Sequence, residues 1–214
     1  MTSREFKARL TRCSHKAGVH VPEEAIAPFE TYFRLLSQWN VKINLTALPL
    51  KTPTDATFDR LFIESLVAAT LIRDAPAIWF DFGSGGGSPA LPLKMIRPAL
   101  SLTLVESKAR KAAFLREAVR VLKLPGTDVA NVRLEELPTP TPQADLVTVR
   151  AVRPDTALLH VAARLLRVGG HLLLFGNPGH LTHAAFERDS PSQSSGTEKV
   201  VTSYIRVFHV EQKH

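Results

Sequence analysis

A glycine-rich segment is the part of the sequence whose residues most clearly indicate chemistry. Four of the eleven glycines fall within positions 83–87, inside the segment 81–89, which reads DFGSGGGSP. In a doubly wound sheet, the turn between the first strand and its helix places a nucleotide-like ligand against bare backbone, and glycine permits that approach. We therefore predict a ligand site at Gly83, Gly85 and Gly87. A loop that binds no ligand is the alternative.

The spacing of these glycines distinguishes two classes of ligand. The dinucleotide fingerprint needs glycine or alanine at its sixth position. That position is Ser88 when counted from the first glycine, and Ala90 when counted from Gly85, which is a partial match. Asp81 before the glycines and the closely spaced Gly87 favour S-adenosylmethionine, while a nicotinamide nucleotide stays open as the second candidate.

Glu106 is the acid that closes the second apolar run of the chain. A carboxylate at this position can accept hydrogen bonds from the two hydroxyls of a ribose, whichever of the two ligands is bound. An exposed acid at the N-terminus of a helix, stabilised by the helix dipole, is the alternative interpretation. We predict that Glu106 belongs to the ligand site.

The elements that must position these residues follow from the apolar pattern. Runs of strand length alternate with helical segments, which predicts parallel strands with right-handed crossovers in an open doubly wound α/β sheet. A final alternating run over 200–210 predicts one or two closing strands. The expected strands are 77–82, 101–105, 129–134, 145–149 and 171–175, and the expected helices between them are 89–97, 107–124 and 155–167.

The first 75 residues have a helical pattern instead. Apolar residues recur at helical spacing from Pro22 to about Trp39, and again over 58–72. We therefore predict a helical N-terminal extension over 1–75 and a Rossmann-like domain over 76–214. The composition of 189–199 predicts a flexible loop within that domain.

Positive charge is concentrated in two places. The net charge is +7; residues 1–20 carry five basic residues and one acid, and residues 106–123 carry six and two. Such concentrations suit a polyanionic partner, although solubility alone is the simpler reading. The first is expected to be a mobile basic arm. On the helix 107–124, four cations share one arc and are candidate RNA contacts, or a solvated face: Lys108, Arg116, Arg120 and Lys123.

Composition excludes several classes of protein. With 44% hydrophobic and 22% charged residues the chain is an ordinary globular sequence, and it contains no apolar run long enough to span a bilayer. Its single cysteine, Cys13, cannot form an internal disulfide, and its histidines have no metal-ligand spacing. No secretory signal pattern opens the sequence. We expect a cytoplasmic protein without metal and without membrane contact, and a monomer.

Several short motifs occur together between about Phe33 and Gly170. They are Trp39-Asn40, Asn44-Leu45-Thr46, Arg60, Glu64-Ser65, 81–93, Glu106-Ser107, Arg110-Lys111, Phe114-Leu115-Arg116, Arg133, Glu135-Glu136-Leu137 and Val149-Arg150-Ala151. In combination these motifs resemble the RsmG (GidB) family of small-subunit ribosomal RNA guanine-N7 methyltransferases. The chain differs from that family in having Ser88, Ala90 and Gly176 where a bulky apolar residue, glycine and lysine are usual.

The resemblance implies a class I S-adenosylmethionine-dependent methyltransferase fold with a helical N-terminal extension. It also implies methylation of N7 of a guanosine in the decoding-region loop of 16S rRNA, with that rRNA or the small ribosomal subunit as partner. By the same resemblance, the cofactor positions are Gly83 and Ser88, then Leu134 and Glu135 at the adenine end, and Arg150 near the donor and the target base.

The chemistry of the acceptor is consistent with this reading. Guanine N7 offers a lone pair with no proton to remove, so it needs neither a cysteine nucleophile nor a lysine base. Arg150 is the predicted catalytic residue, because a planar guanidinium can hydrogen-bond guanine O6 while N7 faces the donor. Three alternatives stay open: a methyltransferase of another RNA or a small molecule, a nicotinamide-dependent reductase, and a non-catalytic RNA-binding protein.

Overall fold

A seven-stranded sheet forms the centre of the computed structural model, which describes residues 1–72, 75, 77–140, 142–150, 154–176, 183–189 and 201–207. The strand order is β3-β2-β1-β4-β5-β7-β6. The first five strands pair in parallel, and β7 is antiparallel to both of its neighbours, which confirms the doubly wound α/β class. The strands are β1 Ile78–Phe82, β2 Ser101–Val105, β3 Thr127–Ala130, β4 Ala144–Arg150, β5 Leu166–Phe175, β6 Phe186–Arg188 and β7 Val201–Arg206.

Helices cover both faces of this sheet, because side chains alternate along each strand. Trp79 of β1 packs into one apolar cluster with α5 (Ala90–Ile96) and α6 (Ala109–Val121). Phe80, the next residue, packs into a second cluster with α7 (Thr156–Leu165). A 3-10 turn, η2 (Leu134–Glu136), follows β3.

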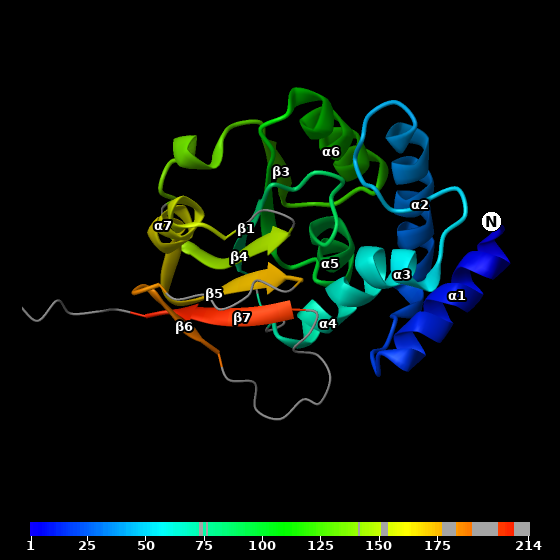
Figure 1. Cartoon of the computed structure of the whole chain (residues 1–214), viewed down its shortest axis with the longest axis horizontal. Helices are drawn as coiled ribbons and strands as arrows, with labels where there is room; N and C mark the ends of the chain where they lie inside the picture. The colour runs from blue at the N-terminus through cyan, green and yellow to red at the C-terminus, as the bar shows by residue number, and fades with distance from the viewer. Residues whose placement is uncertain are drawn as a thin grey trace, which may run out of the picture.

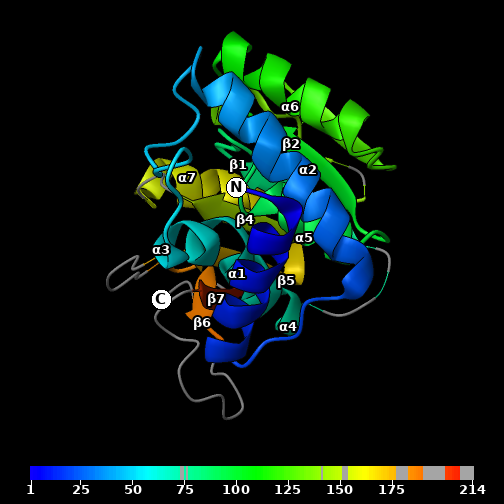
Figure 2. The same cartoon turned by 90° about the vertical axis from the view of Figure 1, so that its right-hand side faces the viewer.

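The N-terminal helices lie beside the carboxyl ends of the parallel strands. They are α1 (Ser3–Lys16), α2 (Glu23–Asn40), α3 (Asp55–Phe58), the π-helical turn η1 (Asp59–Ile63) and α4 (Glu64–Thr70). The arrowheads of β4 and β5 point toward α3 in Figure 1, and α1, α2 and α3 lie in front of the sheet in Figure 2. These helices are therefore placed to form a wall of any site at that edge.

An aromatic cluster joins these helices to one another. Its neighbouring rings have centroids 5.0–6.0 Å apart, within the range for favourable aromatic pairs. The cluster belongs to the same apolar core as α5, α6 and one face of the sheet. Its members are Phe6, Phe29, Phe33, Phe58 and Phe62.

The structure corrects two expectations. Residues 1–20 are not a mobile arm, because Phe6, Leu10 and Cys13 lie on one face of α1 and are buried. The third strand spans Thr127–Ala130 rather than 129–134, since the chain turns into η2 after it. Most of the predicted loop 189–199 lies outside the described residues. The division at residue 75 stays a prediction.

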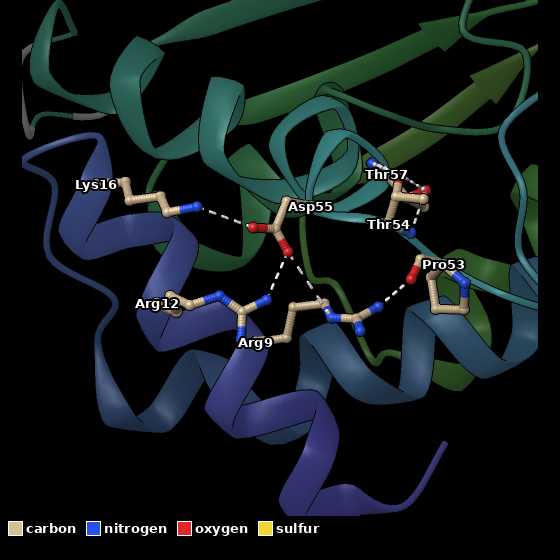
Figure 3. A network of polar contacts seen from close by, with 7 residues as sticks. All are labelled: Arg9, Arg12, Lys16, Pro53, Thr54, Asp55 and Thr57. Atoms are coloured by element: carbon tan, nitrogen blue, oxygen red, sulfur yellow. Dashed lines mark hydrogen bonds and ion pairs between the residues drawn. The ribbon is translucent and has the colours of Figure 1, made fainter.

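A polar network attaches α1 to α3 (Figure 3). The Asp55 carboxylate receives Arg12 Nη2 at 2.5 Å and Lys16 Nζ at 3.0 Å, and Arg9 Nε lies 4.0 Å away. Arg9 also donates to the carbonyl of Pro53. Hydrogen bonds from Arg12 and Lys16 lower the pKa of Asp55 to about 2. The predicted excess of positive charge on this segment is therefore partly neutralised within the protein.

We expect Asp55→Asn to lower the free energy of unfolding at neutral pH. We also expect it to make that free energy vary less with pH in the acid range. The folded-state pKa of Asp55 lies below its ordinary value of 3.8. Its contribution to stability is thus complete above that value and is lost as pH falls toward 2. Urea unfolding at pH 7 and pH 3 measures this. Glu117→Gln, which removes an exposed pair with Arg120 within α6, is the control. Equal pH dependence in Asp55→Asn and wild type would contradict the expectation.

Candidate active site

The glycine-rich turn begins directly after β1 and leads into α5. Gly83, Gly85 and Gly87 have φ of 68°, 51° and 82°, a region that residues with a Cβ rarely adopt. The amide of Ser84 donates to the carbonyl of Val105 at 3.0 Å, which attaches the turn to the end of β2. The sequence therefore folds this segment into a tight turn of bare backbone at the carboxyl edge of the sheet.

Glu106 lies against this turn. Its side chain is buried, with 6% of the residue exposed. One carboxylate oxygen accepts from the amide of Gly85 at 3.0 Å, and the other accepts from the amide of Lys108 at 2.8 Å. Since an ionised carboxylate has about four acceptor positions, Glu106 can also accept from ligand hydroxyls.

A buried chain of hydrogen bonds supports the turn from below. Trp79 Nε1 donates to Thr148 Oγ1 at 2.9 Å, and Thr148 Oγ1 donates to Asp81 Oδ1 at 2.5 Å. Desolvation raises the pKa of Asp81 to about 6, while the hydroxyls of Thr148 and Ser84 act in the opposite direction. These bonds join β1 to β4 at the point where both strands approach the site.

The N-terminal helices hold the turn from the other side. Tyr32 of α2 is fully buried, and its hydroxyl donates to the carbonyl of Gly86 at 2.7 Å. The hydroxyl of Ser88 donates to the carbonyl of Arg60 at 3.0 Å. A Cβ at Gly86 would lie 3.3 Å from Leu36 Cδ1, so α2 packs directly on the turn. The turn is thus held between the sheet and the N-terminal helices.

Arg150 ends β4 beside the same turn. Its Nη1 donates to the carbonyl of Arg60 at 2.6 Å and to Ser88 Oγ at 3.0 Å, and its Nη2 pairs with the carboxylate of Glu64. The guanidinium lies 5.1 Å from the centroid of the Phe175 ring. Burial lowers the pKa of Arg150 to about 9, so the side chain stays a cation at neutral pH. The predicted catalytic residue is therefore held rigidly at the site.

The remaining predicted residues lie farther from this arrangement. Leu134 packs, half-buried, against the α7 side of the sheet, and Glu135 is exposed. Within the described residues, no hydrogen bond or ion pair joins either side chain to the glycine-rich turn. The four predicted RNA-contacting cations on or beside α6 are all exposed, and Arg120 pairs with Glu117 at 2.7 Å.

Sequence reasoning missed three residues of the site. Glu64 lies in a recognised motif but has no predicted role, Phe175 is predicted only as the end of a strand, and no pattern singles out Tyr32. Only Glu64 had a usable signal, because it lies four residues after Arg60, the spacing of an ion pair on a helix. The other contacts depend on how the N-terminal helices pack on the sheet.

Other features of the described residues lie apart from this site. They include no group of three or more potential metal-ligating side chains, and no helix among them is long and apolar enough to cross a membrane. A cavity of about 270 Å³ lies between α1, α2 and the segment 50–51, lined in part by Phe6, Phe33 and Arg34. It contains none of the predicted site residues.

The strand order, the glycine-rich turn after β1 and the acid after β2 define the class of the protein: a class I methyltransferase fold. A crystal structure of a SAM-dependent methyltransferase from Aquifex aeolicus shares this fold, with a TM-score of 0.53 at 13% identity, over 69% of this chain and 91% of that one.

The chain belongs to the family described as rRNA small subunit methyltransferase G (GidB), whose model matches residues 25–210. Ribosomal RNA small subunit methyltransferase G of Roseiflexus sp. (strain RS-1) is 40% identical over 159 residues, which cover 73% of this chain and 67% of that protein. The protein of the same name from Carboxydothermus hydrogenoformans is 37% identical over 178 residues, covering 81% and 74%. The resemblance that the motifs indicated is confirmed.

Proposed function

We propose that this protein transfers the methyl group of S-adenosylmethionine to N7 of a guanosine in the decoding-region loop of 16S rRNA. The observation that carries the proposal is Arg150, a partly buried cation fixed beside the glycine-rich turn. Membership of the rRNA small subunit methyltransferase G family supports the substrate class and disfavours the nicotinamide alternative. The position N7 and the decoding-region loop rest on the motif resemblance.

The residues of the turn fit S-adenosylmethionine. Bare backbone at Gly83, Gly85 and Gly87 permits close approach of a ligand, and Glu106 is placed to accept from ribose hydroxyls. Leu134 and Glu135 would lie toward the adenine end, as the family resemblance implies. When bound, the donor supplies an electrophilic methyl group on a sulfonium centre.

The protein itself contributes alignment and charge placement. Guanine N7 attacks with its own lone pair, so no side chain has to remove a proton. Arg150 would donate a hydrogen bond to guanine O6, which orients the base so that N7 faces the donor. Its three contacts with Arg60, Ser88 and Glu64 keep the guanidinium in place before the RNA arrives.

We also propose that the protein acts on rRNA in the cytoplasm as a monomer, and that α6 contributes RNA phosphate contacts. Lys108 precedes the helix and lies next to Glu106, whereas Lys123 follows its other end. At 1.5 Å per residue, the 13-residue helix places these two positions about 20 Å apart. Lys108 is therefore the phosphate contact closest to the donor site.

We expect Lys108→Ala and Arg116→Ala each to weaken RNA binding across all sequences. Each should also reduce the slope of the logarithm of the binding constant against the logarithm of the salt concentration by about 1, the effect of losing one phosphate contact. Arg120→Ala should have a smaller effect, because that side chain is paired with Glu117. Binding to a 16S rRNA fragment at several salt concentrations measures this. Arg164→Ala, on α7 at the opposite face of the sheet, is the charge-matched control. An equal effect of Arg164→Ala would remove α6 from the interface.

The function itself is tested by methyl transfer. Labelled S-adenosylmethionine is incubated with small ribosomal subunits from a strain that lacks this gene, and N7-specific strand cleavage locates the label. Label at one decoding-region guanosine supports the proposal. Label on a different RNA points to another substrate of the same fold. Donor binding without transfer points to a non-catalytic RNA-binding protein.

A further inference from the structure

Glu64 is a buried acid that, in the mechanism above, contacts Arg150 and neither the donor nor the base. It is the first residue of α4, and 6% of the residue is exposed. Its Oε2 pairs with Arg150 Nη2, and its Oε1 lies 3.3 Å from Arg60 Nη1. One carboxylate therefore binds two guanidinium groups. The side chains of Glu64, Arg60 and Arg150 together retain one net positive charge next to the glycine-rich turn.

The π-helical turn before α4 contacts both Arg150 and the glycine-rich turn. Within η1, the carbonyl of Arg60 accepts from both Arg150 Nη1 and Ser88 Oγ. Ser65, the residue after Glu64, donates to the carbonyl of Pro89 at 3.0 Å. These contacts fasten the start of α4 to the glycine-rich turn and to the end of β4. Single π-helical turns of this kind are frequent at functional sites.

Arg150 keeps one donor that has no partner. Its Nε is buried and has no hydrogen-bond partner among the described residues, whereas Nη1 and Nη2 are both engaged. Since this atom is enclosed by the protein, the unpaired Nε–H carries a cost that the contacts of Nη1 and Nη2 offset. The Phe175 ring against the guanidinium limits its rotation further.

We propose that Glu64 is a positioning residue for methyl transfer: it fixes the orientation of the Arg150 guanidinium, which in the proposed function holds the acceptor base. This inference rests on the proposed function. Glu64 touches neither donor nor acceptor in it, and acts only through Arg150. Arg60, half-exposed, shares the carboxylate and completes a cationic cluster that faces a polyanionic substrate.

Steady-state methyl transfer to small ribosomal subunits tests the inference with Glu64→Gln and Glu64→Asp. We expect Glu64→Gln to lower kcat by about 10-fold to 100-fold, because misplacing a positioned group costs rates of this order. The Kd for S-adenosylmethionine should stay within about twofold of wild type, and Glu64→Asp should recover most of the rate, since it keeps the carboxylate. Glu30→Gln, which removes a similar i,i+4 pair with Arg34 on α2, is the matched control.

A double variant separates positioning from a general structural role. If Glu64 acts through Arg150, then Glu64→Gln combined with Arg150→Ala should be no slower than Arg150→Ala alone. Rate losses that multiply in the double variant overturn the inference. A wild-type kcat in Glu64→Gln overturns it as well.

A measurement without turnover keeps this inference distinct from the proposed function. The ¹⁵N–¹H signal of Arg150 Nε, assigned by its absence in Arg150→Lys, reports how rigidly the guanidinium is held. We expect a slowly exchanging signal in wild type and loss or broadening of it in Glu64→Gln. An unchanged signal in that variant overturns the positioning role. Inactive wild type together with a lost signal overturns only the function.

Discussion

Arg150→Ala is expected to lower kcat for methyl transfer by about 100-fold, the order of loss when a group that aligns the reacting base is removed. The variant should still bind S-adenosylmethionine, because Arg150 contacts the turn through the Ser88 hydroxyl and the backbone contacts of the turn do not depend on it. Single-turnover transfer to small ribosomal subunits, with donor affinity measured by calorimetry, checks both parts.

Arg150→Lys provides the matched comparison for this prediction. Lysine keeps the positive charge but lacks the planar set of donors that reaches Glu64, Ser88 and the Arg60 carbonyl at once. We therefore expect a slow enzyme with near-normal donor affinity. If Arg150→Lys transfers methyl groups as fast as wild type, charge alone suffices and the proposed base contact is wrong.

Gly87→Ala is expected to have the second large effect, on both stability and donor binding. A Cβ at this position would lie 2.9 Å from Leu91 Cγ, closer still to Leu91 Cδ1, and 3.3 Å from Leu115 Cδ2. The φ of 82° adds the cost of a left-handed residue, about 1–2 kcal/mol. Overpacking against buried side chains adds about 1–3 kcal/mol. Since α5 starts from this turn, the displaced backbone should also lose affinity for the donor.

Two controls separate strain from collision at Gly87. Gly18→Ala has a φ of 66° but no atom within 4 Å of the added Cβ, so it should show the conformational cost alone. Leu91→Ala removes the side chain that collides, and Gly87→Ala should cost less in that background than in wild type. Urea unfolding and calorimetric donor titration measure these effects. Equal losses for Gly18→Ala and Gly87→Ala would falsify the packing argument.

The placement of Glu106 beside the glycine-rich turn was predictable because it follows from local sequence and one topological rule. The turn lies after the first strand and Glu106 after the second, and the carboxyl ends of adjacent parallel strands meet at one edge. The 3.0 Å bond between Glu106 and the amide of Gly85 is the result of that rule. Nothing beyond strand order was needed to bring the two together.

The contacts of Arg150 with the N-terminal helices were less predictable, because they depend on packing between distant parts of the chain. Arg150 and Glu64 are separated by 86 positions, and no periodic pattern relates them. The expectation of a mobile arm over residues 1–20 was wrong for a different reason. The number of charges in residues 1–20 carries no information on burial, whereas the helical spacing of Phe6, Leu10 and Cys13 allows these side chains to be buried together. β3 is shorter than expected because the chain turns into η2 after it, and the apolar residues that follow the strand pack from that turn and the segment before it.

The aromatic cluster of the N-terminal helices has a consequence for engineering this enzyme. Phe6, Phe29 and Phe62 share one continuous core with Trp79 of the central strand and Phe114 of α6. Removing α1–α4 would expose this apolar surface to water, at about 25 cal/mol for each Å². The catalytic sheet therefore cannot be trimmed to a minimal module. A chimaera that exchanges these helices for those of a relative must exchange the buried half of α5 and α6 with them.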